Sequence, residues 1–220
     1  MKINLANIKK AQKLLNKREC VAIPTETVYG LAANAYSDIA CKKIYKLKKR
    51  PQNNPLIVHY LNNQILKKDC NFNNDFLKLY KKFCPGPITF ILNLNSSSKI
   101  SMKITGGKRI LAVRFPKHPV TRQLLKQLKF PLAAPSANLF SKLSPVSYND
   151  VIEDFGKKIK YVLDGGKSSI GVESTIIDLR DKPKILRLGG LEISNIEKVL
   201  NKNVIVQNNN KKIITPGQYK

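Results

Sequence analysis

Residues 20–31 constrain the fold of this chain most strongly, because an apolar run stops there at a proline. Residues 20–23 are apolar and Pro24 ends the run. Before Gly30 the chain then carries three hydroxyl side chains and one carboxylate, from Thr25, Thr27, Tyr29 and Glu26. A buried strand followed by proline, hydroxyls and glycine is typical of a binding loop at a strand's carboxyl end in an α/β protein. The residues would also fit a threonine-rich β-turn, so the prediction depends on the rest of the chain.

The remaining chain alternates predicted helices and strands, which is the pattern of an α/β protein. Apolar spacing and capping residues predict helices over about 4–17, from 37 or 38 to no later than 50, 76–83, 120–128, and from 147 and 194 onward. Apolar runs predict strands over 20–23, 31–36, 56–59, 88–94, 110–115, 131–134, 161–164, 176–179 and 185–188. Two pairs have the spacing of helix-capping boxes: Ser147 with Asp150, and Ser194 with Glu197.

Two cations lie two residues apart where a predicted helix must end. Lys48 and Arg50 precede Pro51, and the residue before a proline disfavours helical backbone. In extended backbone both side chains would point to the same side, where they could grip a phosphate. The alternative is that they only complement the negative end of the helix dipole.

Further polar residues interrupt or follow the predicted strands. Arg114 lies inside an apolar strand, where a buried cation requires an anionic partner. That partner is either a carboxylate of the protein core or the carboxylate of a ligand. Ser136 and Asn138 follow a strand that breaks at Pro135, and their alternation allows both to face one cleft.

Familiar catalytic patterns are absent from the sequence. Gly166-Lys167 resembles the end of a phosphate-binding loop, but Tyr161 stands where that loop requires its first glycine. Only His59 and His118 are available for catalysis through histidine, and His118 is predicted to lie in an exposed turn. No carboxylate cluster predicts a metal site held by the protein. The hydroxyls, amides and cations at strand ends therefore favour binding of phosphate and carboxylate groups over acid–base chemistry.

The charge of the chain suggests polyanions as partners. Forty lysines and arginines against fourteen acidic residues give a net charge of +26, which attracts nucleic acid, tRNA first. The excess consists mainly of lysine spread along the chain, so codon bias in an AT-rich genome is an alternative explanation.

The cysteines and the hydropathy pattern predict a cytoplasmic protein. The four cysteines form no Cys-x-x-Cys pair, so we expect buried, reduced thiols. We also expect no signal peptide, because residues 1–4 run straight into an amphipathic segment. No partnership with membranes is expected, because no apolar run reaches 18 residues.

A set of motifs covers almost the whole chain, at residues 24–31, 48–51, 53–59, 84–89, 113–116, 134–138, 164–166, 173–178 and 186–189. In type and order these motifs resemble those of the YrdC-like family. The resemblance implies an α/β fold with a twisted mixed sheet and flanking helices around a large basic cavity. It also implies an L-threonylcarbamoyladenylate synthase, a nucleotidyltransferase that joins L-threonine, bicarbonate or CO2, and ATP with release of pyrophosphate. The product feeds threonylcarbamoyladenosine modification of tRNA, so tRNA and the machinery that transfers the group are expected partners.

The resemblance also implies roles for individual residues. The catalytic set is Lys48, Arg50, Ser136 and Asn138. The ATP-binding set is Arg50, Asn54, Ser136, Ser144 and Arg187. The threonine-binding set is Thr27, His59, Arg114 and Ser174. Mg2+ is expected to be carried by ATP, with no metal held by the protein.

The resemblance predicts two segments. Residues 1–202 form the catalytic domain, and residues 203–220 form a basic tail that resembles the start of the linker in long family members. There the linker leads to a second, smaller domain, which would begin where this sequence ends at Lys220.

Three alternatives to the synthase stay open. One is a non-catalytic module that binds double-stranded RNA or tRNA. A second is a carbamoyl-adenylate-forming relative of the kind found in carbamoyltransferases, and a third is a paralogue with another substrate.

Overall fold

One continuous mixed sheet organises the protein. The computed structural model describes residues 4–207. The ten strands are β1 (Val21–Ile23), β2 (Gly30–Asn34), β3 (Ile57–His59), β4 (Cys70–Asn71), β5 (Ile88–Leu94), β6 (Ile110–Arg114), β7 (Leu132–Ala133), β8 (Thr175–Asp178), β9 (Lys184–Arg187) and β10 (Ile205–Val206). They lie in the order β1-β2-β7-β3-β6-β5-β8-β9-β10, and β4 pairs with β5. The pairs β3–β6, β5–β8 and β9–β10 are parallel and the others are antiparallel, which confirms the predicted mixed sheet.

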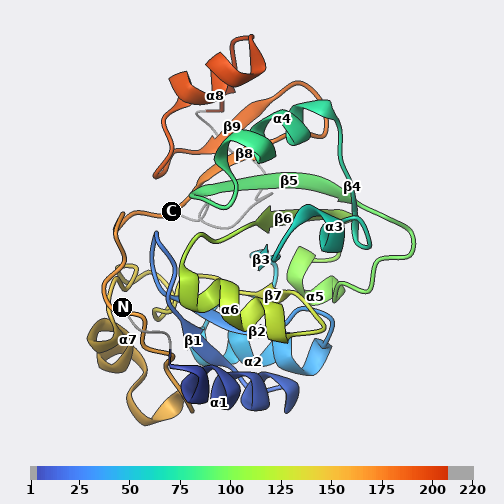
Figure 1. Cartoon of the computed structure of the whole chain (residues 1–220). Coiled ribbons are helices and arrows are strands. Elements are labelled where there is room, and N and C mark those ends of the chain that lie inside the picture. Colours follow the sequence, from blue (N-terminus) through green and yellow to red (C-terminus); the bar gives the residue numbers. More distant parts are fainter. Residues whose placement is uncertain (1–3, 208–220) are drawn as a thin grey trace.

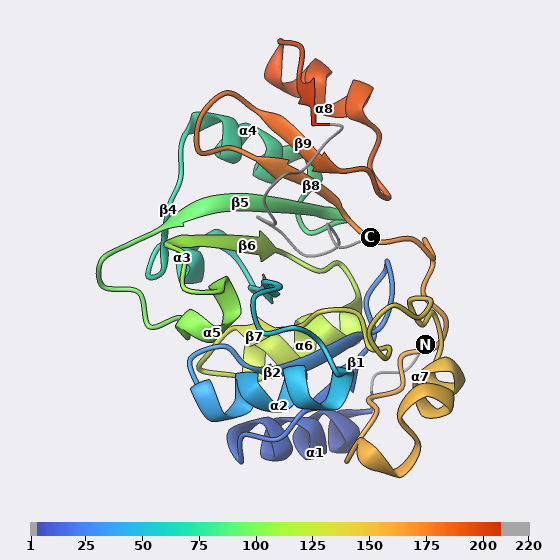
Figure 2. The ribbon, with the colours of Figure 1, turned by 180° about the vertical axis from the view of Figure 1, so that it is seen from behind.

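Helices cover one face of this sheet and only part of the other. They are α1 (Leu5–Asn16), α2 (Asp38–Lys48), α3 (Asn63–Leu66), α4 (Asn74–Phe83), α5 (Met102–Thr105), α6 (Pro119–Gln127), α7 (Tyr148–Phe155), the short 3-10 turn η1 (Gly156–Lys158) and α8 (Ile193–Leu200). Opposite views of the ribbon show α2 and α6 on opposite sides of the sheet (Figures 1 and 2).

Strand alternation explains this layering. Val58, Val113 and Ile177 point to the face on which the buried residues of α2, α4, α5 and α8 form the main core. On the other face, α1 and α6 pack over β1, β2 and β7. The rest of that face carries a small apolar cluster, which includes Ile57 and Ile176. The candidate site lies beside this cluster.

Most predicted elements are present, but one predicted strand and one predicted capping box are not found among the described residues. Residues 161–164 form no regular strand, because Val162 makes only one bridge, to Ala22. The box predicted for Ser194 and Glu197 is absent, since α8 follows Glu192 without a side-chain cap. The Glu197 carboxylate instead accepts a hydrogen bond from the N–H of Val204 at 2.8 Å. The box of Ser147 and Asp150 is confirmed.

The sheet continues beyond the predicted domain boundary at residue 202. Ile205 and Val206 pair with Lys184 and Ile185 of β9, so two residues assigned to the basic tail belong to the sheet. The remainder of that tail, residues 208–220, lies outside the described residues, and the division into two segments stays a prediction.

Candidate active site

A tight loop follows β1 at the centre of the candidate site. The hydroxyl of Thr25 accepts hydrogen bonds from the main-chain N–H groups of Thr27 and Val28, at 3.2 and 3.3 Å. It also donates to the carbonyl oxygen of Val28 at 2.6 Å. One short polar side chain thus satisfies three main-chain groups of the turn. The turn in this way holds the Thr27 side chain at the wall of a neighbouring hollow.

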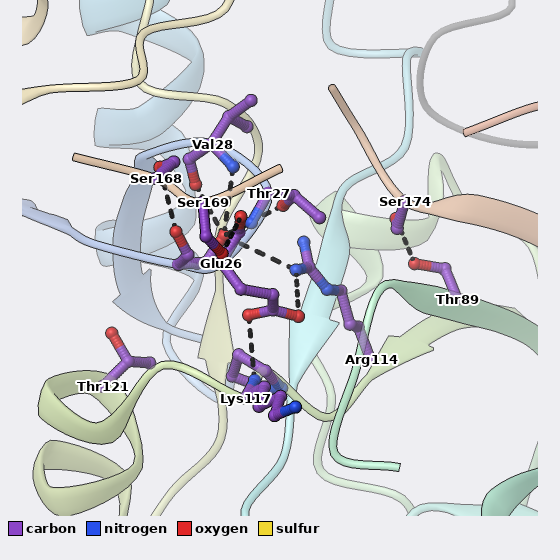
Figure 3. A network of polar contacts seen from close by, with 12 residues as sticks. Glu26, Thr27, Val28, Thr89, Arg114, Lys117, Thr121, Ser168, Ser169 and Ser174 are labelled. Carbon is purple, nitrogen blue, oxygen red and sulfur yellow. Dashed lines mark hydrogen bonds and ion pairs between the residues drawn. The ribbon is translucent and has the colours of Figure 1, made fainter. Parts of the chain in front are cut away.

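Residues 165–171 brace the same loop. The hydroxyl of Ser168 donates to the carbonyl oxygen of Thr25 at 2.9 Å, and the N–H of Ile170 donates to that of Glu26 at 2.9 Å. Figure 3 shows Ser168 beside the loop. The glycine-rich segment that lacked the phosphate-loop spacing therefore has a structural role: it fixes the main chain from which Glu26 projects.

A row of polar side chains crosses the sheet next to this loop. Cross-strand pairing places Arg114 of β6 between His59 of β3 and Thr89 of β5. The hydroxyl oxygens of Thr89 and Ser174 lie 2.7 Å apart (Figure 3). The row brings His59, Arg114 and Ser174 to one level of the sheet.

A hollow of about 300 Å³ opens over this row. All four residues predicted to bind threonine line it: Thr27, His59, Arg114 and Ser174. Two nitrogens of this set, Nδ1 of His59 and Nε of Arg114, are buried and have no hydrogen-bond partner among the described residues. Unpaired buried polar groups are rare in folded proteins. Both nitrogens belong to residues that line the smaller hollow.

The imidazole of His59 is neutral in this environment. Burial, with the nearby Arg114 charge, holds the pKa of His59 well below its usual value. A neutral ring can donate or accept one hydrogen bond at Nδ1, according to its tautomer.

Arg114 has a carboxylate partner within the protein. Its Nη2 lies 2.8 Å from Oε1 of Glu26, and both side chains are buried. Of the two partners considered from the sequence, the structure shows the core carboxylate. Burial alone would raise the pKa of Glu26, but the charge and hydrogen bond of Arg114 outweigh it, and the pKa is lowered.

A larger hollow of about 680 Å³ adjoins the smaller one. All seven residues predicted to bind nucleotide or to act in catalysis line it: Lys48, Arg50, Asn54, Ser136, Asn138, Ser144 and Arg187. Ser136, Glu173 and Arg187 line both hollows. The structure therefore brings the two predicted sets together along a shared wall, while their roles remain predictions.

Lys48 reaches this site differently from what the sequence indicated. It is the last residue of α2 and not part of an extended segment, and Lys49 then adopts a left-handed conformation with φ 52°. The Lys48 ammonium donates to the carbonyl oxygens of Ser136 and Asn138 at 2.6 and 2.5 Å, and to Oδ1 of Asn138 at 3.0 Å. All three of its hydrogens thus have acceptors within the protein. Burial, with the charge of Arg50, lowers the pKa of Lys48 to about 7.

Asn138 and Arg50 are also held by protein groups. The Asn138 amide accepts from Lys48 and donates to the carbonyl oxygen of Lys142 at 2.5 Å. The Arg50 guanidinium donates to both side-chain and main-chain oxygens of Asn54. Ser136 is half-buried at the wall shared by the hollows.

Glu173 is a site residue that sequence reasoning gave no role. Its carboxylate accepts from the hydroxyl of Ser144 at 3.1 Å and forms an ion pair with Arg187. Gly189 packs directly against the main chain of Glu173, since a Cβ at position 189 would lie 2.3 Å from the carbonyl oxygen of Glu173. The acidic residue just before β8 was visible in the sequence, but its pairing with Arg187 depends on the β8–β9 register.

His118 does not lie in an exposed turn, so that expectation was wrong. It is half-buried before α6, and its Nε2 lies 3.2 Å from the carbonyl oxygen of Gly165. Burial lowers the pKa of His118. Its ring thus packs against the segment that braces the loop, outside both hollows.

The cysteines are free thiols, as expected. Cys20, Cys41 and Cys70 are buried and Cys84 is half-buried. Burial raises the pKa of Cys20 and of Cys41 to about 12. Within residues 4–207 no three His, Cys, Asp or Glu side chains group as a metal site would require, and no helix is long and apolar enough to cross a membrane.

Comparison with known proteins identifies the family. The Sua5/YciO/YrdC family model, described as telomere recombination, matches residues 13–189. The chain belongs to this family. It is 44% identical over 197 residues to the threonylcarbamoyl-AMP synthase of Pyrococcus abyssi, covering 88% of this chain and 57% of that protein. The Bacillus subtilis protein of the same name is 41% identical over 219 residues, with 97% and 63% covered.

A solved Sua5/YciO/YrdC structure agrees with this assignment. The P. abyssi Sua5 crystal structure complexed with L-threonine superposes with a TM-score of 0.95 at 38% identity, over 100% of this chain and 66% of that one. The described twisted sheet with its flanking helices is thus the fold of the family. The chain spans less than two thirds of the length of either synthase named above.

Proposed function

We propose that this member of the Sua5/YciO/YrdC family forms L-threonylcarbamoyladenylate from L-threonine, bicarbonate or CO2, and MgATP. One observation carries the proposal: the smaller hollow is lined by His59 and Arg114, each of which has a nitrogen without a hydrogen-bond partner among the described residues. A small amino acid has a carboxylate for the Arg114 guanidinium and further polar groups for a neutral imidazole. The P. abyssi relative complexed with L-threonine supports that choice of amino acid.

In this proposal the nucleotide occupies the larger hollow. Arg50 and Arg187, with the Ser136 and Ser144 hydroxyls, lie at its wall and would bind the phosphates of MgATP. The Mg2+ ion would arrive on the triphosphate and keep several of its waters. The shared wall brings the amino acid and the α-phosphate to neighbouring positions, which lowers the entropic cost of their reaction.

The reaction needs no nucleophile from the protein. The threonine amine takes up CO2 and loses a proton to give a carbamate. A carbamate oxygen then bonds to the α-phosphorus, and the bond from that phosphorus to the bridging oxygen breaks to release pyrophosphate. The protein would contribute by bringing several anions together and stabilising charge during the displacement. Fixed hydroxyls and cations suit that task.

Pyrophosphate release tests the proposal. Purified protein with MgATP and bicarbonate should release pyrophosphate when L-threonine is added and not without it. Arg50→Ala should abolish that release with the fold intact, whereas Lys46→Ala, at an exposed position on the helix α2 that precedes Arg50, should leave it unchanged. Pyrophosphate release that does not depend on threonine, or no pyrophosphate release by the wild-type protein, would refute the proposed synthase activity.

A second candidate function is binding of double-stranded RNA or tRNA. A groove of about 1080 Å³ separate from the two hollows is lined by five lysines: Lys43, Lys46, Lys49, Lys158 and Lys160. Such a rim suits a phosphate backbone. Binding to a double-stranded RNA should weaken steeply with salt and less steeply after Lys46→Ala with Lys158→Ala. An unchanged salt slope in that variant would reject the groove as the RNA site.

A further inference from the structure

The Glu26 side chain has been given no role in the reaction, although its partner Arg114 lines the smaller hollow. Both side chains are buried, at 6% and 4% exposure, and Nη2 of Arg114 lies 2.8 Å from Oε1 of Glu26. The other oxygen of Glu26 accepts the main-chain N–H of Lys117 at 2.9 Å. Figure 3 shows the carboxylate between these two donors. Both of its oxygens are therefore fixed.

The pair joins two rigid elements. Glu26 projects from the loop that Thr25 and Ser168 hold, and Arg114 ends the central strand β6. A buried ion pair gives little net stability, because desolvation of both charges offsets their attraction. Such a pair can instead fix geometry, and here the group that it holds, Arg114, lines the smaller hollow.

The hydrogen bonds of Arg114 leave two of its three guanidinium nitrogens uncommitted. Those within the described residues all come from Nη2, to Glu26 and, at 3.5 Å, to Thr25. Within the same residues Nη1 makes no hydrogen bond, and Nε has no partner but is buried. An arginine side chain has several rotatable bonds, so without Glu26 the guanidinium could turn to other acceptors. The carboxylate fixes which nitrogens remain for a ligand.

We propose that Glu26 is a positioning residue for Arg114, which it holds by Nη2 so that Nη1 of the guanidinium receives the carboxylate of the amino-acid substrate. This inference rests on the proposed function and adds a residue to its amino-acid site. Glu26 makes no contact with the substrate in this account. It acts only through Arg114. Because it also neutralises the positive charge of Arg114, binding of the substrate carboxylate depends more on the orientation of the guanidinium than on long-range attraction.

Glu26→Gln tests this role, because it keeps the size of the side chain and removes its charge. We expect the KM for L-threonine to rise at least tenfold while the KM for ATP changes less than twofold. Glu26→Asp, which keeps the charge but is one carbon shorter, should give a smaller rise. Thr121→Val is the matched control, since Thr121 bonds to Pro24 of the same loop without touching Arg114. It should leave the KM for threonine unchanged.

Calorimetric binding separates positioning from a general structural effect. The wild-type protein should bind L-threonine more tightly than L-threoninamide, which lacks the carboxylate, and Glu26→Gln should reduce that preference at least fivefold. In a double-mutant cycle, adding Glu26→Gln to Arg114→Gln should cause no further loss of threonine affinity. Additive losses of threonine affinity in this cycle would overturn the proposal. So would an unchanged preference for threonine over threoninamide in folded Glu26→Gln or Glu26→Asp protein, or equal changes in the KM values for threonine and ATP. Absence of threonine-dependent turnover in the wild type would instead refute the proposed function.

Discussion

The Nζ atom of Lys48 lies 2.6 Å from the carbonyl oxygen of Ser136. The lysine at the end of α2 thus holds the segment that forms another wall of the larger hollow. The N–H of Phe140 returns a hydrogen bond to the carbonyl oxygen of Lys48 at 2.9 Å. The two segments are joined in both directions, so Lys48 shapes the larger hollow by contacts within the protein alone.

This clamp predicts local loosening when the ammonium is removed. In Lys48→Met without nucleotide, amide hydrogen exchange in residues 136–140 should accelerate at least tenfold, which corresponds to about 1.4 kcal/mol of local stability. Hydrogen-exchange mass spectrometry measures this directly. Lys46→Met, at an exposed position on the same helix, is the control and should change nothing there. Equal exchange in both variants would contradict the clamp.

The lowered pKa of Lys48 predicts a pH dependence of ATP binding. With a pKa of about 7, Lys48 is mostly neutral above that pH in the free protein. Bound phosphates favour the charged form of Lys48 and raise its pKa. In the free protein Glu173 and Asp154 act in the same direction, whereas burial and the charge of Arg50 lower the pKa. Binding above pH 7 should therefore take up a proton, and ATP affinity should fall as pH rises, by at most tenfold per pH unit.

Calorimetry in buffers of different ionisation enthalpy measures that proton uptake at pH 8. Lys48→Met should abolish it. Equal proton uptake by the wild type and the variant would show that another group titrates.

Removal of the negative charge of Glu173 should strengthen ATP binding. Glu173 is the single acidic side chain among the described residues that line the larger hollow, and it repels a triphosphate. Glu173→Gln should tighten ATP binding several-fold, because Ser174 still accepts from Nε and Nη2 of Arg187. Glu153→Gln changes the net charge equally at an exposed position outside the hollow and serves as the control. Weaker ATP binding in Glu173→Gln would show that Glu173 is needed to position Arg187.

The layered fold could be predicted because apolar spacing and strand alternation are local properties of the sequence. The extended strand β5, for example, is found at the predicted residues 88–94. The short elements α3, α5, β4 and β10 were missed, since two to four residues carry too little periodicity. Val162 illustrates the opposite error, a strand that was predicted but not formed: Val162 packs in the core, yet its segment makes a single bridge.

The site residues could be predicted as a set, but not their hydrogen-bond partners. The predicted residues do line two adjoining hollows. Nothing in the sequence indicates that Lys48 bonds to residues 136–138, or that Arg114 meets Glu26 across 88 residues. Such pairs are set by sheet order and by loop bracing, which are tertiary properties.

Isotope-labelled product formation tests the central claim most directly. The protein should be incubated briefly with MgATP, L-threonine and 13C-bicarbonate, and the quenched mixture analysed by mass spectrometry. The account predicts L-threonylcarbamoyladenylate that carries one 13C atom, in an amount equal to the pyrophosphate released. ATP breakdown without labelled adenylate, or no reaction with both substrates bound, would contradict it.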